Sequence, residues 1–341
     1  MKLILVLALI FAVAFASDFQ EFTIKYNKQY STQEEFQKRL QIFESNKKFI
    51  NEHNTQGHSF QLALNEFADL THEEFSKFYL AKRFDATKLQ RNNVKTFPKG
   101  LKLPTTVDWR QHNAVTHIKN QGQCGSCWSF STTGSVEGAR AIATGALISL
   151  SEQQLVDCSG SYGNQGCNGG LMDDAFKYII ATGGLETETR YPYTAQDGTC
   201  QAQSSYFRSD ISGFQDIASG NEDDLQAAVA NVGPISVAID AGQQSFQFYS
   251  SGVYYSAGCS PTNLDHGVLA VGYGVYDTKD YWLVKNSWGT SWGLQGYIMM
   301  SRNRNNNCGI ATMASYPTGA HAAASNKVKF TNIQKLVPFQ P

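Results

Sequence analysis

Residues 121–131, QGQCGSCWSFS, hold two cysteines three positions apart, Cys124 and Cys127, and several kinds of chemistry use such a pair. A redox disulfide belongs in a βαβ unit, and no such pattern precedes Gln121. A zinc site needs a second close pair of Cys or His, whereas the other cysteines are widely separated. A structural disulfide, a buried structural thiol and a nucleophile remain as interpretations.

Cys127 opens a predicted helix, and a thiol in the first turn of a helix faces unpaired backbone N–H groups that favour thiolate. A thiolate that attacks a carbonyl needs a histidine to protonate the leaving group. Among seven histidines, His266 stands at a strand start, from which its side chain can be aimed into a cleft. Asn286 could orient the imidazole, Trp288 could cover that bond from water, and Gln121 could donate to an oxyanion. Taken alone, His266 could be structural and Asn286 a turn residue.

The elements that position these residues follow from caps and periodicity. A helix is predicted from Cys127 to about Thr144, Ser151 and Gln154 are typical of the start of a second, and residues 171–182 indicate a third. Later segments rich in Val, Ile, Tyr and Trp are predicted strands, at 234–240, 267–276, 281–287 and 296–302. Helices first and antiparallel strands later predict an α+β fold with two halves that meet at a cleft.

The chain divides into four expected segments. Residues 1–16 combine a basic start with an unbroken apolar run, which predicts a cleaved signal peptide, and no stretch is long enough to span a membrane. Residues 17–102, the leader, contain a predicted helix over 32–54 that opens with a Thr32–Glu35 capping box, and end in a lysine-rich linker over 82–102 that proteases should cut easily. Residues 103–318 form the body, and 319–341 a basic extension of unknown role.

The leader and the body carry opposite charge excesses. The whole chain has a net charge of −1, but the leader carries 14 Lys/Arg and 11 Asp/Glu, and the body 10 and 18. We expect the two to attract each other, and acid, or in part salt, to weaken that attraction. The acidic body argues against nucleic acid as a partner.

The motif Cys124-Gly125-Ser126-Cys127-Trp128, with His266 and Asn286 further on, resembles the papain family of cysteine peptidases, in its cathepsin L-like branch. Two leader patterns resemble the propeptides of that branch. One is a helical stripe of Glu35, Arg39, Ile42, Phe43, Asn46, Ile50 and Asn54. The other is Ala63-x-Asn65-x-Phe67-x-Asp69, in which Ala replaces the usual Gly and leaves the local backbone in question.

The resemblance implies a role for each site residue. Cys127 would be the nucleophile, His266 its acid/base partner, Asn286 the orienter and Gln121 an oxyanion-hole donor. The implied disulfides are Cys124–Cys167, Cys158–Cys200 and Cys259–Cys308, which leave Cys127 unpaired. The implied substrate-binding residues are Gly169 and Gly170 in the cleft, Trp288, and an apolar S2 pocket of Met172, Ala238, Leu264 and Met313.

We therefore expect a papain-like fold with a helical N-terminal half and a β-barrel-like C-terminal half, preceded by an inhibitory helical prodomain. The expected protein is a monomeric zymogen of a cysteine endopeptidase that hydrolyses proteins and peptides with hydrophobic P2 residues. No metal or other cofactor is implied. The signal peptide directs it to the secretory pathway, either to a lysosome-like acidic compartment or out of the cell. The alternatives are a non-catalytic binding or inhibitor protein on a peptidase scaffold, and a leader that inhibits peptidases in trans.

Overall fold

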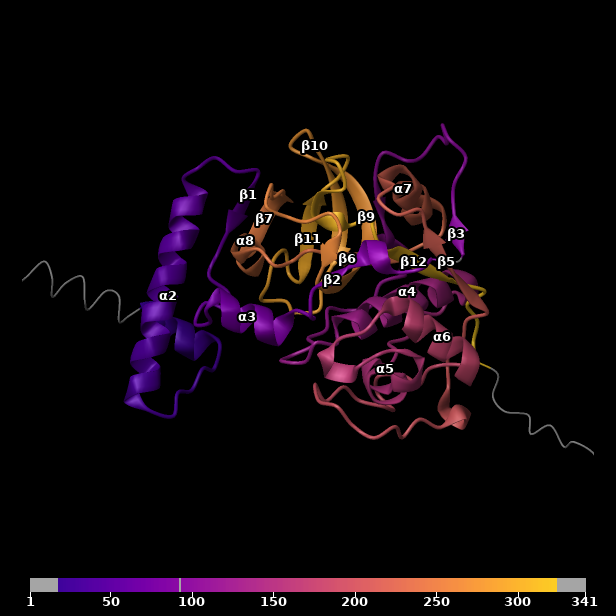
Figure 1. The fold of residues 1–341 in the computed structure, drawn as a ribbon, viewed down its shortest axis with the longest axis horizontal. Helices are drawn as coiled ribbons and strands as arrows, with labels where there is room; N and C mark the ends of the chain where they lie inside the picture. The colour runs from indigo at the N-terminus through magenta and orange to yellow at the C-terminus, as the bar shows by residue number, and fades with distance from the viewer. Residues whose placement is uncertain (1–17, 92, 324–341) are drawn as a thin grey trace, which may run out of the picture.

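The chain folds as an α+β body with a helical leader laid across one face of it (Figure 1). The computed structural model describes residues 18–91 and 93–323, so the predicted signal peptide and most of the C-terminal extension lie outside the described residues. Residues 18–25 are helical. The further α-helices are α2 (Gln33–Asn54), α3 (His72–Tyr79), α4 (Cys127–Thr144), α5 (Glu152–Cys158), α6 (Met172–Thr182), α7 (Glu222–Asn231) and α8 (Gln244–Gln247). The strands are β1 (Phe60–Leu62), β2 (Phe84–Asp85), β3 (Val94–Lys95), β4 (Val107–Asp108), β5 (Gly213–Ile217), β6 (Ile235–Ile239), β7 (Tyr249–Tyr254), β8 (Asn263–Leu264), β9 (His266–Tyr276), β10 (Lys279–Lys285), β11 (Tyr297–Ser301) and β12 (Ala314–Thr318).

A ten-stranded sheet combines the strands of one half of the body with two strands of the leader. Its strands follow the order β1-β7-β11-β10-β9-β6-β12-β5-β3, and β4 pairs with β9. Most neighbours are antiparallel, whereas β11–β7 and β3–β5 are parallel. The four predicted strand segments are confirmed as β6, β9, β10 and β11, and so is the α+β class.

The helices of the other half begin and end at capping residues. The Ser151 side chain accepts from the Gln154 N–H at the start of α5, and Gly145 ends α4 in the left-handed conformation at φ 74°. The predicted helices are thus confirmed. Figure 1 shows α4, α5 and α6 gathered below the strands, where α4 packs against both β9 and α6.

Three disulfides tie loops to these elements. They join Cys124 to Cys167, Cys158 to Cys200 and Cys259 to Cys308, the same pairs that the resemblance implies. The first brings the loop before α6 against the start of α4, and Cys127 is the free cysteine.

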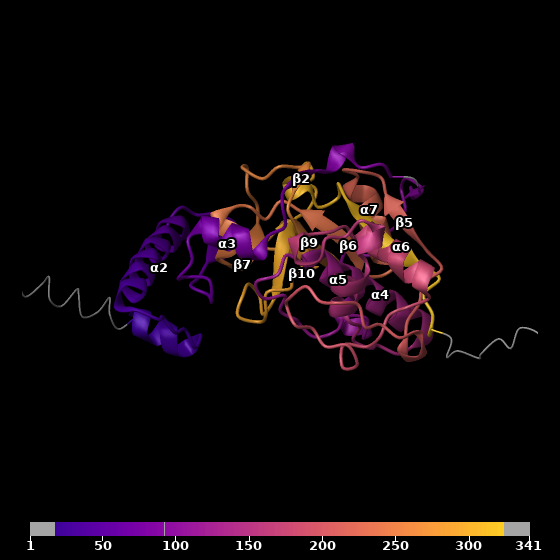
Figure 2. The ribbon, with the colours of Figure 1, turned by 60° about the horizontal axis from the view of Figure 1, so that its bottom comes forward.

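The leader contributes a strand to both edges of the body's sheet. Its β1 pairs with β7 at one edge, and its β3 pairs with β5 at the other. Between them β2 pairs with β8. Figures 1 and 2 show α2 outside α3 and β7, and the rest of the leader crossing the body to β3. The linker predicted over 82–102 is therefore wrong in part, because β2 and β3 are held by pairing, and strands of two residues leave no period in a sequence.

The asparagines on the α2 stripe bind backbone of the segment that follows. The Asn46 amide, in a side chain that is 3% exposed, donates to the carbonyls of Ala68 and Leu70 at 2.9 Å each. Asn54 donates to Leu62 O and accepts from Leu62 N–H. The stripe therefore pairs polar groups that the fold would otherwise bury unsatisfied.

Of the two reciprocal hydrogen bonds of the predicted capping box, only one is present. The Thr32 side chain accepts from Glu35 N–H, but the Glu35 carboxylate bonds to Arg39 at 2.6 Å instead of returning to the cap. Arg39 also bonds to Glu74 at 2.6 Å, so it joins α2 to α3. The reciprocal box occurs at α3, between Thr71 and Glu74.

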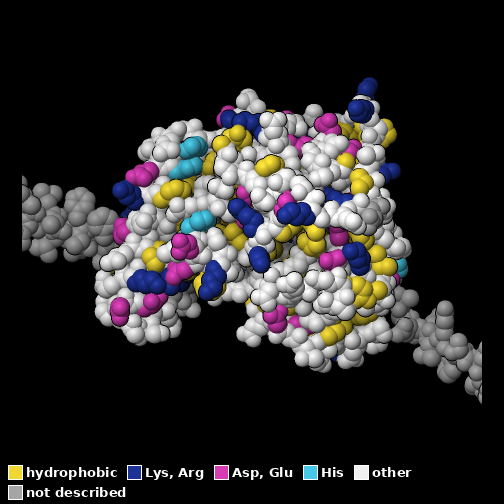
Figure 3. Space-filling view, viewed as in Figure 1, with side chains coloured by type: hydrophobic (Ala, Val, Ile, Leu, Met, Phe, Trp, Pro, Cys, Tyr) yellow, Lys and Arg dark blue, Asp and Glu magenta, His cyan; other side chains and the backbone are white. Residues whose placement is uncertain are grey.

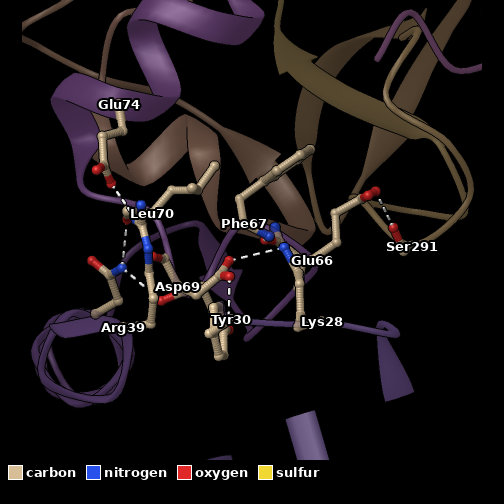
Figure 4. Close-up of polar contacts among 12 residues, drawn as sticks. Lys28, Tyr30, Arg39, Glu66, Phe67, Asp69, Leu70, Glu74 and Ser291 are labelled. Carbon is tan, nitrogen blue, oxygen red and sulfur yellow. Dashed lines mark hydrogen bonds and ion pairs between the residues drawn. The ribbon is translucent and has the colours of Figure 1, made fainter. Parts of the chain in front are cut away.

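Asp69 joins three other residues of the leader. Its carboxylate accepts from Lys28 Nζ and Tyr30 Oη, each at 2.9 Å, and its carbonyl accepts from Arg39 (Figure 4). Ala63, which replaces the usual glycine, is not among the residues with positive φ and donates its N–H to Phe248 O. Alanine is therefore accommodated at that position.

Replacing Asn46 with Ala should lower the free energy of unfolding by about 2 kcal/mol, because one buried and one partly buried carbonyl would lose this donor. Chemical denaturation of the full chain measures the change. Lys48→Ala is the matched control, since that side chain on the same helix is 77% exposed. Equal stabilities of the two variants would contradict this account of the asparagine stripe.

Candidate active site

Cys127 is the first residue of α4, and its sulfur lies against the start of β9. The Gly267 N–H donates to Cys127 Sγ at 3.3 Å, and the thiol is 1% exposed. A Cβ at position 267 would lie 3.1 Å from Trp128 Cα and 3.2 Å from Trp128 N. A side chain at position 267 would therefore push β9 away from the first turn of α4 by a few tenths of an ångström.

His266 precedes that glycine and is held by Asn286. Its Nε2 lies 2.7 Å from Asn286 Oδ1, which also accepts from Ser287 N–H at 2.8 Å. Since Asn286 Oδ1 accepts, Nε2 carries the ring proton. His266 Nδ1 is buried and has no hydrogen-bond partner among the described residues. The imidazole thus presents an unprotonated nitrogen, while the next residue, Gly267, holds the thiol.

Trp288 covers this hydrogen bond from water. Its ring stacks on the His266 ring at a centroid distance of 4.6 Å and is completely buried. Phe67 and Phe75 of the leader pack edge-on against it, at 5.9 and 5.1 Å. The leader therefore seals the side of the site that Trp288 covers.

Gln121 is fixed so that its amide faces the leader. Its Oε1 accepts from Ser287 Oγ at 2.7 Å, which leaves Nε2 to donate to Cys124 O at 3.0 Å and to Tyr79 O at 3.3 Å. Tyr79 is a leader residue. The predicted oxyanion donor is thus bonded to a carbonyl of the leader.

Burial shifts the pKa of both Cys127 and His266. It raises the pKa of Cys127 to about 11, although the N–H groups of Gly267 and Trp128 act in the opposite direction. It lowers the pKa of His266 to about 4, against the hydrogen bond to Asn286. The sequence predicts a thiolate, whereas in this zymogen structure burial favours the neutral forms of the thiol and the imidazole, because it penalises each charge.

The four residues of the predicted apolar pocket lie in one hydrophobic cluster, and the leader packs against that cluster. Met172, Ala238, Leu264 and Met313 are buried in one hydrophobic cluster. Phe84 of the leader packs against this cluster and pairs with Leu264 along β2 and β8. The structure therefore brings these four residues together.

The predicted cleft glycines lie beside the path of the leader. A Cβ at Gly169 would lie 3.6 Å from that of Ala81, and Gly170 lies against Trp128. The Ala81 N–H donates to Asp265 O at 2.8 Å, next to His266. The leader backbone thus passes directly over the predicted site.

A buried charged network behind the site was not predicted. Lys119 Nζ lies 3.2 Å from Glu137 and 2.6 Å from Glu152, and Lys285 donates to Thr116 Oγ1 at 2.9 Å. Lys119 comes two residues before Gln121, and Lys285 directly before Asn286. A lysine inside the apolar run YWLVKNS was the only signal for it. No cluster suited to a metal ion occurs in the described ranges.

Comparisons with known proteins agree with this geometry. Residues 103–318 match the papain family of cysteine proteases, and residues 19–75 match the cathepsin propeptide inhibitor domain. The chain belongs to the papain family of cysteine proteases. It is a cathepsin L-like protease in its zymogen form, with a papain-like fold.

Its relatives cover almost the whole chain. It is 55% identical to digestive cysteine proteinase 2 of Homarus americanus, over 90% of this chain and 96% of that protein. It is 49% identical to procathepsin L of Mus musculus, over 90% and 93%. The structure of digestive procathepsin L 3 of the Tenebrio molitor larval midgut is similar at a TM-score of 0.81, with 45% identity over 89% of this chain and 99% of that one.

Alkylation of Cys127 tests the buried, neutral thiol. Near neutral pH, iodoacetamide should modify it at least about 100-fold more slowly in the folded zymogen than in urea-unfolded zymogen with intact disulfides, because a thiol of pKa about 11 holds little thiolate. Mass spectrometry measures the rate. In the folded zymogen the rate should still rise as the pH passes 9. Equal rates in the two states would contradict the assignment.

Proposed function

We propose that this protease is an endopeptidase in which Cys127 attacks the peptide carbonyl and His266 transfers the protons. Asn286 orients the imidazole, and Gln121 donates to the oxyanion. The supporting observation is that His266 keeps Nδ1 without a described partner while its neighbour Gly267 bonds to the Cys127 sulfur.

Removal of the leader starts the chemistry. Water then reaches the site, so burial no longer opposes charge, and a Cys127 thiolate and a His266 imidazolium stabilise each other. Asn286 is neutral, so the thiolate remains the counter-charge of the imidazolium. The N–H groups at the start of α4 add to the stability of the thiolate.

The reaction proceeds by acyl transfer. Cys127 Sγ bonds to the carbonyl carbon, and the oxygen takes the negative charge beside Gln121 Nε2. His266 gives its proton to the leaving amine as the C–N bond breaks, which leaves a thioester. A water molecule then gives a proton to His266 and attacks the thioester, and the thiolate leaves from the carboxylic acid product.

The contacts of the leader are those that a substrate would use. Its Tyr79 carbonyl accepts from Gln121, its Ala81 N–H donates to Asp265 O, and its Phe84 ring lies on the apolar pocket. A substrate offers a carbonyl, an amide and an apolar side chain of the same kinds. The leader therefore inhibits by occupying the cleft in the place of a substrate.

The pocket favours a bulky apolar P2 residue. Met172, Ala238, Leu264 and Met313 offer no charged group, and burying an arginine among them would leave its charge unpaired. Leucine or phenylalanine gains the free energy of apolar burial instead.

The site at which the leader is cut and the destination of the protein also follow from the sequence and the fold. We place the mature N-terminus near residue 103, because residues 98–102 are exposed beyond the paired strand β3. The three disulfides and the apolar residues 3–16 support entry to the secretory pathway, with an acidic compartment or the cell exterior as the destination. Among the described residues no helix is long and apolar enough to cross a membrane.

Acid activation of the purified zymogen tests the proposed catalyst. Hydrolysis of a fluorogenic Leu-Arg or Phe-Arg peptide should appear at low pH, be blocked by a thiol-directed epoxide, and be absent from Cys127→Ala. The leader of that variant is removed in trans by an added protease, so that a covered site cannot explain its inactivity. An inactive wild-type enzyme after leader removal would instead support a binding protein on a peptidase scaffold.

A library of peptides that vary only at P2 tests the pocket. Activated enzyme should cleave peptides with Leu or Phe at P2 at least about tenfold faster, in kcat/KM, than peptides with Arg, because the arginine would be buried without a partner. A strong preference for Arg at P2 would show that the assigned residues do not form the pocket.

A further inference from the structure

Two buried aspartates of the body share one basic partner, and that partner belongs to the leader. Asp240 follows β6, and Asp265 lies between β8 and β9, directly before His266. Their side chains are 0% and 5% exposed. Arg83 Nη2 pairs with Asp240 Oδ1 and lies 3.4 Å from Asp265 Oδ2. Within residues 18–91 and 93–323, Arg83 is the one basic side chain that forms an ion pair with either carboxylate.

The body itself holds both carboxylates in place. Asp240 accepts from the N–H groups of Ser260 at 2.7 Å and of Gly242 at 3.1 Å. Asp265 accepts from Ala241 N–H at 2.8 Å. None of these donors belongs to the leader, so the two carboxylates keep their positions when the leader is removed.

Gly242 leaves the space that the guanidinium occupies. A Cβ at this position would lie 2.6 Å from Arg83 Nη2, 2.9 Å from Asp265 Oδ2 and 3.2 Å from Asp240 Oδ1. The site is therefore a cradle of two carboxylates over a residue without a side chain. It is seen occupied by a guanidinium, whose planar group suits paired carboxylates.

The cradle opens toward solvent along the path of the leader. The Arg83 side chain is 48% exposed although both of its partners are buried. Figure 3 shows Lys and Arg side chains gathered on this face, over the part that β2 crosses. A basic side chain from outside the body can thus reach the two carboxylates once the leader has gone.

Loss of Arg83 would leave two buried carboxyl groups close together without a cation beside them. Burial raises the pKa of Asp265 to about 7, and the charge of Asp240 adds to that effect, although Arg83 acts in the opposite direction. Without Arg83, the binding of another cation would lower the electrostatic free energy of the two carboxyl groups.

We propose that Asp240, Asp265 and Gly242 form a subsite of the mature protease that binds an arginine or lysine side chain of the substrate. Arg83 fills this subsite in the zymogen. Ala81, two residues before Arg83, donates to Asp265 O beside His266, so the bound side chain belongs to a residue close to the scissile bond. The subsite is separate from the apolar pocket proposed for P2, and the inference rests on the proposed peptidase activity.

Arginine–citrulline pairs of peptides test the subsite, because citrulline keeps the shape of arginine without its charge. One residue is placed in turn at each position on either side of the scissile bond, with leucine held at P2. Activated wild-type enzyme should cleave the arginine peptide about tenfold faster in kcat/KM than the citrulline peptide at one position. Asp240→Asn should bring that ratio close to one. Asp223→Asn, which makes the same charge change at an exposed position, should keep it.

Gly242→Ala keeps both carboxylates and fills the cradle, so it serves if Asp240→Asn does not fold. It should also abolish the preference for arginine. Equal cleavage of both peptides by the wild type at every position, or a preference that survives in either variant, would overturn the proposal. If the wild type cleaves neither peptide after its leader is removed, the proposed peptidase function fails, and the subsite fails with it.

Discussion

The approach of β9 to the first turn of α4 is the constraint on which the site depends. It joins the strand half to the helical half at the place where Gly267 binds the Cys127 sulfur and His266 lies beside it. The disulfide Cys124–Cys167 holds the loop beside this turn, and the Lys119 network fixes the segments that carry Gln121 and Asn286. A small change in the packing of the two halves would therefore move the thiol away from the imidazole, whatever the residue types.

The leader covers the same junction between β9 and α4. Its backbone and apolar groups lie beside the site, where burial raises the pKa of Cys127 and lowers the pKa of His266. Burial of this kind disfavours a thiolate and an imidazolium alike, in addition to limiting access to the site. The strands β1 and β3 hold the leader at both edges of the sheet, so the cleft segment does not depend on its own contacts alone.

Much of this could be predicted from the sequence, because the informative features are local. Helix ends follow from Ser151, Gly145 and Gly183, and the types and order of Cys127, His266 and Asn286 indicate the chemistry. What could not be predicted depends on pairs far apart in the chain. Ser287 fixes Gln121 from 166 residues away, and Arg83 meets Asp240 across 157 residues. Strands of two residues, such as β2 and β3, leave no periodic pattern.

The opposite charges of leader and body act through a few buried contacts. Arg91 of the leader is 10% exposed, pairs with Asp216 at 3.1 Å and donates to the carbonyls of Thr312 and Ala314. Arg83 meets two further buried carboxylates. Salt screens exposed charges much more than buried ones, so ionic strength weakens these contacts less than the net charges of the two segments suggest. Protonation removes the charge of a carboxylate whether it is buried or exposed, so we expect acid to loosen the leader more effectively than salt does.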